Sequence, residues 1–351
     1  MIERTTQTRD EPGREGLDRR RVLGGGALLL TGLGGFTQQA VTPPAQPPEA
    51  LSLSANLLTR MAAAVRLNGR SPRLFVLDTG AERTSIARDL AEALGLPAGP
   101  TVVVHGITSA QETPTAVAGR VTFGRRRFNN VVMPVFERSL LAADGLLGLD
   151  ILSQFRLSMN LADRTVSLTP SGPAFYAGGS ASVIPTRLPG GARARLDSSG
   201  QLILTNAVAD GVPVQSFVDS GGQYSIGNTA LLRAIGGQVG SRPIPLYGVT
   251  GQTIDAYAGR LNTLRIGRHE LGATPLLFAE LHAFNTLGLG DQPALLIGAD
   301  VLYRFRRVEL DYGARRMGFG GLQPRTTPSA IERSWIALMA PPSMRTREPV
   351  T

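Results

Sequence analysis

The 351-residue chain is long enough for one large or two modest domains, and its 42% apolar content allows a sizeable buried core. The absence of cysteine excludes disulfides, thiolate catalysis and cysteine-ligated zinc. The net charge is +9 without a single lysine, but the arginines are scattered and no nucleic-acid-binding motif accompanies them, so we expect no nucleic-acid partner. The densest arginine run outside the N-terminal region, residues 125–127, follows Gly124 and is interpreted as a hairpin turn.

The N-terminal segment, residues 1–50, is expected to direct export. Arg19 and Arg20 precede a glycine-rich apolar run over 24–36, a pattern that resembles a twin-arginine signal followed by a proline-rich spacer. The run is shorter than the roughly 20 apolar residues of a membrane-spanning helix, so no stable membrane span is expected. A disordered basic tail with a chance apolar patch is the alternative. The signal predicts a periplasmic or secreted protein.

An internal repeat organises the rest of the chain. Residues 75–81 (FVLDTGA) match residues 216–222 (SFVDSGG), and Asn-Gly or Asp-Gly, both strong hairpin signals, precedes each copy. Further blocks match in the same order: 105–108 with 247–250, 118–120 with 258–260, 148–152 with 298–302, and 155–156 with 305–306. The chain is therefore interpreted as a tandem duplication.

Each copy reads as short strands separated by glycine, proline and asparagine turns, which predicts a mainly β fold with two homologous lobes and few short helices. One helix is expected over 87–94, and another after each Gly-x-Asp-x-Leu block. The predicted organisation after the signal has four parts: an N-terminal lobe (51–170), a linker (171–190), a C-terminal lobe (191–322) and a tail (323–351). Apolar residues of the tail share one face of a short helix, which would dock on the lobes or bind a partner.

Asp78 and Asp219 are the candidate catalytic residues. Each follows an apolar strand, and a carboxylate in such a place must be hydrogen-bonded, paired or functional because burying it alone is unfavourable. Two carboxylates brought together share one proton. The ionised one can then act as general base on a water, while the protonated one hydrogen-bonds a substrate carbonyl.

The residues that follow each aspartate are suited to supporting such a pair. The hydroxyls of Thr79 and Ser220 can satisfy backbone groups of the opposite loop. Gly80 and Gly221 carry no Cβ, so the two loops can approach closely. A duplicated lobe would present both loops around a pseudo-twofold axis.

These features resemble the aspartic proteases, in particular the retropepsin-like branch of bacterial exported proteins. The resemblance covers about residues 55–320. It is carried by residues 78–81 with Thr84, by residues 219–222 with Ser225, and by the apolar-apolar-Gly blocks at 146–148 and 296–298. It implies a bilobal fold, an interlobe cleft, and hydrolysis of a polypeptide substrate without metal or cofactor. Both halves lie in one chain, which implies a monomer with an intramolecular pseudo-dimer.

The resemblance also assigns further residues. Ala81 and Gly222 complete the two loops, although Gly222 departs from the Ala, Ser or Thr usual in the family. The segments His105-Gly106 and Tyr247-Gly248 fall where the family has its flaps. Tyr247 would hydrogen-bond near the dyad or, alternatively, pack as an ordinary aromatic on its hairpin.

Several other polar residues are interpreted as structural. Asp150 and Asp300 are expected to hydrogen-bond near a short helix, and Asn160 and Asp311 to lie in turns. The three histidines, at 105, 269 and 282, are far apart in sequence, which argues against a zinc site.

Two classes of function remain. The first is an active endopeptidase of the cell envelope. The second is a catalytically silent peptide-binding or scaffold protein that keeps the fold. Both aspartates and the glycines behind them are intact, which favours the enzyme. A single-lobe protease acting as a homodimer conflicts with the duplication.

Overall fold

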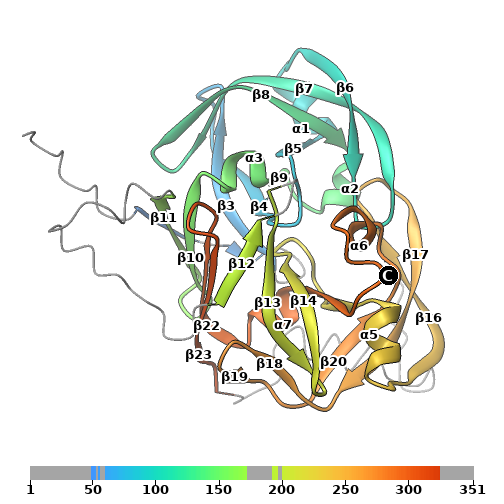
Figure 1. Cartoon of the computed structure of the whole chain (residues 1–351). Coiled ribbons are helices and arrows are strands. Elements are labelled where there is room, and N and C mark those ends of the chain that lie inside the picture. The colour runs from blue at the N-terminus through green and yellow to red at the C-terminus, as the bar shows by residue number, and fades with distance from the viewer. Residues whose placement is uncertain (1–48, 53, 56–59, 172–191, 197–199, 325–351) are drawn as a thin grey trace, which may run out of the picture. The chain divides into compact units, whose positions relative to one another are not determined.

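The computed structural model describes residues 49–52, 54–55, 60–171, 192–196 and 200–324. The predicted export signal, nearly all of the predicted linker and the predicted tail helix lie outside these residues. Both lobes belong to one compact unit and are mainly β. Figure 1 shows the N-terminal lobe in blue to green and the C-terminal lobe in yellow to red.

The N-terminal lobe is built on an eight-stranded sheet with the order β2-β3-β4-β9-β5-β8-β7-β6. Its strands are β2 (Ser54–Ala55), β3 (Met61–Leu67), β4 (Arg73–Leu77), β5 (Ser85–Ala87), β6 (Ala98–His105), β7 (Ala110–Phe123), β8 (Arg126–Phe136) and β9 (Gly145–Leu147). A tight turn at Gly124 and Arg125 joins β7 to β8, so the arginine run lies at a hairpin as predicted.

The C-terminal lobe repeats this arrangement within a larger sheet. Its strands are β13 (Leu202–Ala209), β14 (Val212–Val218), β15 (Ile226–Gly227), β16 (Val239–Tyr247), β17 (Thr253–Leu261), β18 (Leu264–Ile266), β19 (His269–Glu270), β20 (Thr274–Phe278) and β21 (Ala294–Ile297). The pairing β14–β21 is parallel, as is its counterpart β4–β9.

Strands from both copies pair with each other at one end of the larger sheet. The pairing order there is β1-β11-β10-β22-β23-β12, and β10 lies antiparallel to β22. These strands are β1 (Glu49–Ser52), β10 (Phe155–Asn160), β11 (Thr165–Pro170), β12 (Ala192–Leu196), β22 (Phe305–Asp311) and β23 (Arg316–Leu322). The two lobes are therefore joined by backbone hydrogen bonds as well as by the chain.

Six short helices occur in the described residues: α1 (Arg88–Ala93), α2 (Arg138–Leu141), α3 (Leu149–Leu152), α5 (Thr229–Ala234), α6 (His282–Thr286) and α7 (Ala299–Leu302). The first agrees with the helix expected over 87–94. The helices α3 and α7 lie within the Gly-x-Asp-x-Leu blocks, so the prediction that they follow these blocks is wrong. The glycine of each block is the N-cap, and the aspartate lies in the first turn.

The repeated hairpins direct each Asp-(Thr/Ser)-Gly loop to the same place in its lobe. Asn68 and Gly69, like Asp210 and Gly211, adopt positive φ, as Asn-Gly and Asp-Gly turns require. The strand after each turn is buried at its end, with Leu77 beside Leu147 and Val218 beside Ile297. None of the described helices is long and apolar enough to cross a membrane.

Candidate active site

Asp78 and Asp219 stand at the ends of the two equivalent strands β4 and β14. The backbone N–H of Asp78 donates to Leu147 O at 3.0 Å, and that of Asp219 donates to Ile297 O at 3.0 Å. Each aspartate is thereby fixed beside the apolar-apolar-Gly block of its own lobe. Because the parallel pairing is the same in both copies, the two loops are presented by equivalent backbone.

The hydroxyls behind the aspartates tie the two loops together. Thr79 Oγ1 donates to Val218 O at 2.7 Å and accepts from the Ser220 N–H at 3.0 Å. Reciprocally, Ser220 Oγ donates to Leu77 O at 2.6 Å and accepts from the Thr79 N–H at 3.2 Å. Both side chains are fully buried, so these bonds satisfy backbone groups that water cannot reach. The predicted cross-loop role of the two hydroxyls is confirmed.

Each glycine of the pair packs against the carboxyl of the opposite loop. A Cβ on Gly80 would lie 2.7 Å from Asp219 Cγ, and one on Gly221 would lie 2.4 Å from Asp78 Cγ. Both distances are far below van der Waals contact, so only glycine allows this approach. Ala81 and Gly222 complete the loops by donating their N–H groups to the aspartate of their own loop.

Each carboxyl group lies against the glycine of the opposite loop and accepts hydrogen bonds from its own loop. Asp78 Oδ1 accepts from Gly80 and Ala81 at 2.9 and 3.0 Å. Asp219 Oδ1 accepts from Gly221 and Gly222 at 2.9 and 2.8 Å. The remaining carboxyl oxygens are left for the partner carboxyl and for a molecule in the cleft.

Burial raises the pKa of both carboxyls. For Asp78, desolvation is the main cause, opposed by hydrogen bonds from its loop and by the charge of Arg60. For Asp219, desolvation together with the negative charge of Asp78 raises the pKa to about 7. The pair can therefore hold one proton near neutrality, which is the state that a shared dyad requires.

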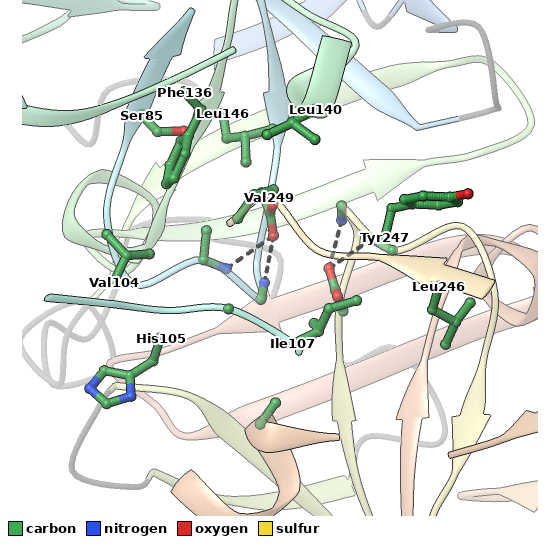
Figure 2. A pocket seen from close by; sticks show the side chains of 18 of the residues that line it. Ser85, Val104, His105, Ile107, Phe136, Leu140, Leu146, Leu246, Tyr247 and Val249 are labelled. Carbon is green, nitrogen blue, oxygen red and sulfur yellow. Dashed lines mark hydrogen bonds between the residues drawn. The ribbon is translucent and has the colours of Figure 1, made fainter. Parts of the chain in front are cut away.

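A cleft of about 400 Å³ opens over the two carboxyls. Figure 2 shows its apolar walls: Phe136, Leu140 and Leu146 come from the N-terminal lobe, and Leu246 and Val249 from the C-terminal lobe. A long, mainly apolar trough with a few central polar groups is suited to an extended chain with alternating side chains.

Two hairpins border this cleft where the flaps were expected. The hairpin β6–β7 carries His105 and Gly106, and the hairpin β16–β17 carries Tyr247 and Gly248; all except Gly248 line the cleft. Tyr247 is 69% exposed and lines the cleft. In the described part of the chain no hydrogen bond links its hydroxyl to the dyad.

The tips of the two hairpins meet each other and a helix of the C-terminal lobe. The hydroxyls of Thr108 and Ser109 each lie 3.3 Å from Thr250 Oγ1. His105 Nδ1 lies 3.0 Å from His282 Nε2 of α6, and the two rings are stacked with an interplanar angle of 5°. In addition, the backbone N–H of His282 donates to Ile107 O. The sequence separation of these histidines concealed this contact, whereas His269 lies elsewhere and bonds Phe319 O.

Asp150 and Asp300, which recur in the two copies, accept hydrogen bonds from the residues that follow the Asp-(Thr/Ser)-Gly loops. Asp150 Oδ1 accepts from the hydroxyl and N–H of Thr84, and Thr84 Oγ1 in turn accepts from the Gly148 N–H. Asp300 Oδ1 accepts from Ser225 Oγ, which accepts from the Gly298 N–H. Both aspartates also accept from the first turn of their helix, so their predicted hydrogen-bonding role is confirmed.

Arg60 is a site residue that sequence reasoning missed. It is half-buried, lines the cleft together with both aspartates, and donates from Nη2 to Leu141 O. It precedes β3 and belongs to none of the matched blocks, so no motif pointed to it. An alignment of the two copies could have pointed to it, because that alignment places the charged Arg60 opposite the uncharged Gln201.

Two β lobes that each give one Asp-(Thr/Ser)-Gly loop to a shared cleft define the class of acid-protease folds. A family profile described as aspartyl protease matches residues 63–151 and, separately, residues 205–301, together more than half of the chain. The chain belongs to the aspartyl protease family, and the double match confirms the tandem, retropepsin-like duplication. Among curated proteins, a search for similar sequences finds no match.

Proposed function

We propose that the protein is an aspartic endopeptidase in which Asp78 and Asp219 act together on one water. The observation that carries this proposal is the placement of two carboxyls, one from each lobe, against the glycine of the opposite loop and in one cleft that the expected flap hairpins also line. Family membership supports a peptidase, and the pKa of about 7 for Asp219 supports a dyad that holds a single proton.

The chemistry would proceed without covalent attachment to the protein. The ionised carboxylate removes a proton from water, and the water oxygen forms a bond to the carbonyl carbon of the peptide. The protonated carboxyl hydrogen-bonds the carbonyl oxygen as negative charge develops there. The nitrogen then takes a proton from the dyad, the carbon–nitrogen bond breaks, and a carboxyl and an amine leave.

We also propose an exported, periplasmic or secreted enzyme that acts as a monomer on polypeptide substrates. The twin arginine at 19 and 20 supports export. The interlobe bonds of Thr79 and Ser220 support the assembly of the site within one chain.

Cleavage of a denatured protein, followed by mass spectrometry of the products, tests the proposal. Wild type should release peptides with free carboxyl and amino ends, and a chelator should leave the rate unchanged because the dyad needs no metal. Peptide binding without cleavage at any pH between about 3 and 8, the range in which a dyad with one raised pKa would work, would instead identify a silent, peptide-binding relative.

A further inference from the structure

The hydrogen bonds around the two candidate carboxyls are nearly symmetric, but the charged residue beside them is not. The loop hydrogen bonds, cross-loop hydroxyls and facing glycines repeat in both lobes. Strand pairing shows that Arg60 and Gln201 occupy equivalent positions. Two residues after Arg60, Ala62 pairs with Val76, and two residues after Gln201, Ile203 pairs with Phe217 in the same way. The first lobe therefore places a guanidinium beside the dyad, where the second places a neutral amide that donates to Val218 O.

The guanidinium of Arg60 is held in place and remains charged. Its hydrogen bond to Leu141 O fixes one end, and the side chain is only half-buried. Burial lowers the pKa of Arg60, while both aspartates act in the opposite direction. An arginine stays ionised under such conditions because its ordinary pKa is so high. A fixed positive charge thus faces the two carboxyls from one side.

From this asymmetry we infer that Arg60 assigns the roles within the dyad: Asp78 carries the negative charge and acts as general base, and Asp219 keeps the proton. Arg60 is a positioning residue, since it acts through the carboxyls and not on the substrate. The inference rests on the proposed peptidase function and goes beyond it, because a symmetric pair would leave the two roles interchangeable.

The direction of the electrostatics agrees with this assignment. Burial raises the pKa of both carboxyls. The charge of Arg60 opposes this rise at Asp78, whereas the charge of Asp78 adds to it at Asp219, whose pKa reaches about 7. The other ionisable groups that line the cleft are Glu82, Arg83, His105, Tyr224 and Tyr247. The buried Tyr312 also interacts with Asp78. Burial and the negative charge of Asp78 raise the pKa of Tyr312, so this neutral phenol adds no competing charge.

The test replaces Arg60 by the residue that the other lobe uses. Arg60→Gln removes the charge and supplies the amide that Gln201 has in the second lobe. Arg60→Lys keeps the charge. Arg127→Gln makes the same change at an exposed arginine outside the cleft and serves as the matched control.

Two readouts are compared across these variants. The first is the pH profile of kcat/KM on a cleaved peptide. The second is the ¹³C NMR titration of the aspartate Cγ atoms, assigned with Asp78→Asn and Asp219→Asn, which needs no substrate. We expect the acid limb, and the first carboxyl titration, to rise by about one pH unit in Arg60→Gln. Arg60→Lys should largely restore both, and Arg127→Gln should change neither.

The NMR titration also reports which carboxyl ionises first. In wild type, Asp78 Cγ should move in the lower step and Asp219 Cγ in the upper one, whereas in Arg60→Gln both should move in both steps. An unchanged first step in Arg60→Gln, or Asp219 ionising first in wild type, would overturn the role of Arg60. Absence of peptide cleavage by wild type would instead refute the proposed function, while the NMR comparison would still decide the electrostatic assignment.

Discussion

At the scale of a single residue, the buried carboxyl group of Asp219 makes the stability of the folded protein depend on pH. Its side chain is 6% exposed, and its pKa in the folded protein is raised to about 7, above the ~3.9 of an unfolded aspartate. A raised carboxyl pKa means that the folded state binds the proton more tightly than the unfolded state does. The resulting stability is present at low pH and is lost as the pH rises from about 4 through 7.

Asp219→Asn should therefore stabilise the protein at pH 8 by about 2–4 kcal/mol and much less at pH 4. Asparagine keeps an oxygen for the N–H groups of Gly221 and Gly222 but never ionises. Urea unfolding at the two pH values measures the difference. Asp291→Asn, an exposed control, should show no such gain at pH 8. An equal or lower stability of Asp219→Asn at pH 8 would contradict the raised pKa.

The hydroxyl of Thr79 joins the two candidate loops by hydrogen bonds to the opposite loop. Thr79→Val keeps the shape but leaves the Ser220 N–H without its partner and removes one of the two donors to Val218 O. The free energy of unfolding should fall by about 1–3 kcal/mol, because buried polar groups are costly when unpaired. The exposed Thr101→Val is the matched control and should change it little. Chemical denaturation of both variants checks the difference.

At the scale of elements, the hairpin β6–β7 is held over the cleft by contacts at its tip. His282→Ala removes the ring contact to His105, which is the side-chain link from α6 to this hairpin. Hydrogen exchange of residues 105–109 should become several-fold faster in this variant, because local opening then breaks fewer contacts. His269→Ala removes a histidine away from the cleft and should leave the exchange of these residues unchanged. Equal exchange in wild type and His282→Ala would show that the contact does not hold the flap.

Sequence patterns predicted the elements that local chemistry determines. The turns at Asn68-Gly69 and Asp210-Gly211, the helix near 88–93, and the two Asp-(Thr/Ser)-Gly loops all follow from short motifs with a direct physical reason. Features made by long-range packing were not predictable in this way. The contact between His105 and His282 depends on how the flap meets the other lobe. The position of Arg60 beside the dyad likewise depends on tertiary packing, and no local pattern reports it.

The short helices α3 and α7 show why one local prediction failed. Their start is set by close packing against the other half of the loop: a Cβ on Gly148 would lie 2.4 Å from the Arg83 backbone, and one on Gly298 would lie 2.5 Å from that of Tyr224. The helix therefore begins at once after each glycine, and the aspartate turns back to bond Thr84 or Ser225.

At the scale of the whole molecule, duplication and function explain each other. One lobe supplies one carboxyl, and the strands β10 and β22 join the lobes so that both carboxyls reach one cleft. Fusion of the two halves also allows them to differ, and Arg60 opposite Gln201 is such a difference. A symmetric homodimer could not place a charge on one side only.

The proposed export concerns the whole chain and rests on the proposed twin-arginine signal at residues 19 and 20. Replacing Arg19 and Arg20 by lysine keeps the charge but should retain the protein in the cytoplasm, because a receptor reads the arginine pair. Cell fractionation with immunoblotting measures the distribution. Arg9→Lys with Arg14→Lys makes the same chemical change upstream of the pair and should export normally. Full periplasmic recovery of the Arg19/Arg20 variant would refute the twin-arginine assignment.

The most direct test of the central claim is the pH dependence of peptide cleavage by wild type, Asp78→Asn and Asp219→Asn. A dyad sharing one proton predicts a bell-shaped profile for wild type, with activity lost as the pH rises through about 7, where Asp219 loses its proton. Each asparagine variant should stay folded and lose at least about 1,000-fold in kcat/KM, since it lacks either the base or the transferable proton. A folded asparagine variant that cleaves at near wild-type rate would show that the two aspartates do not form a catalytic pair.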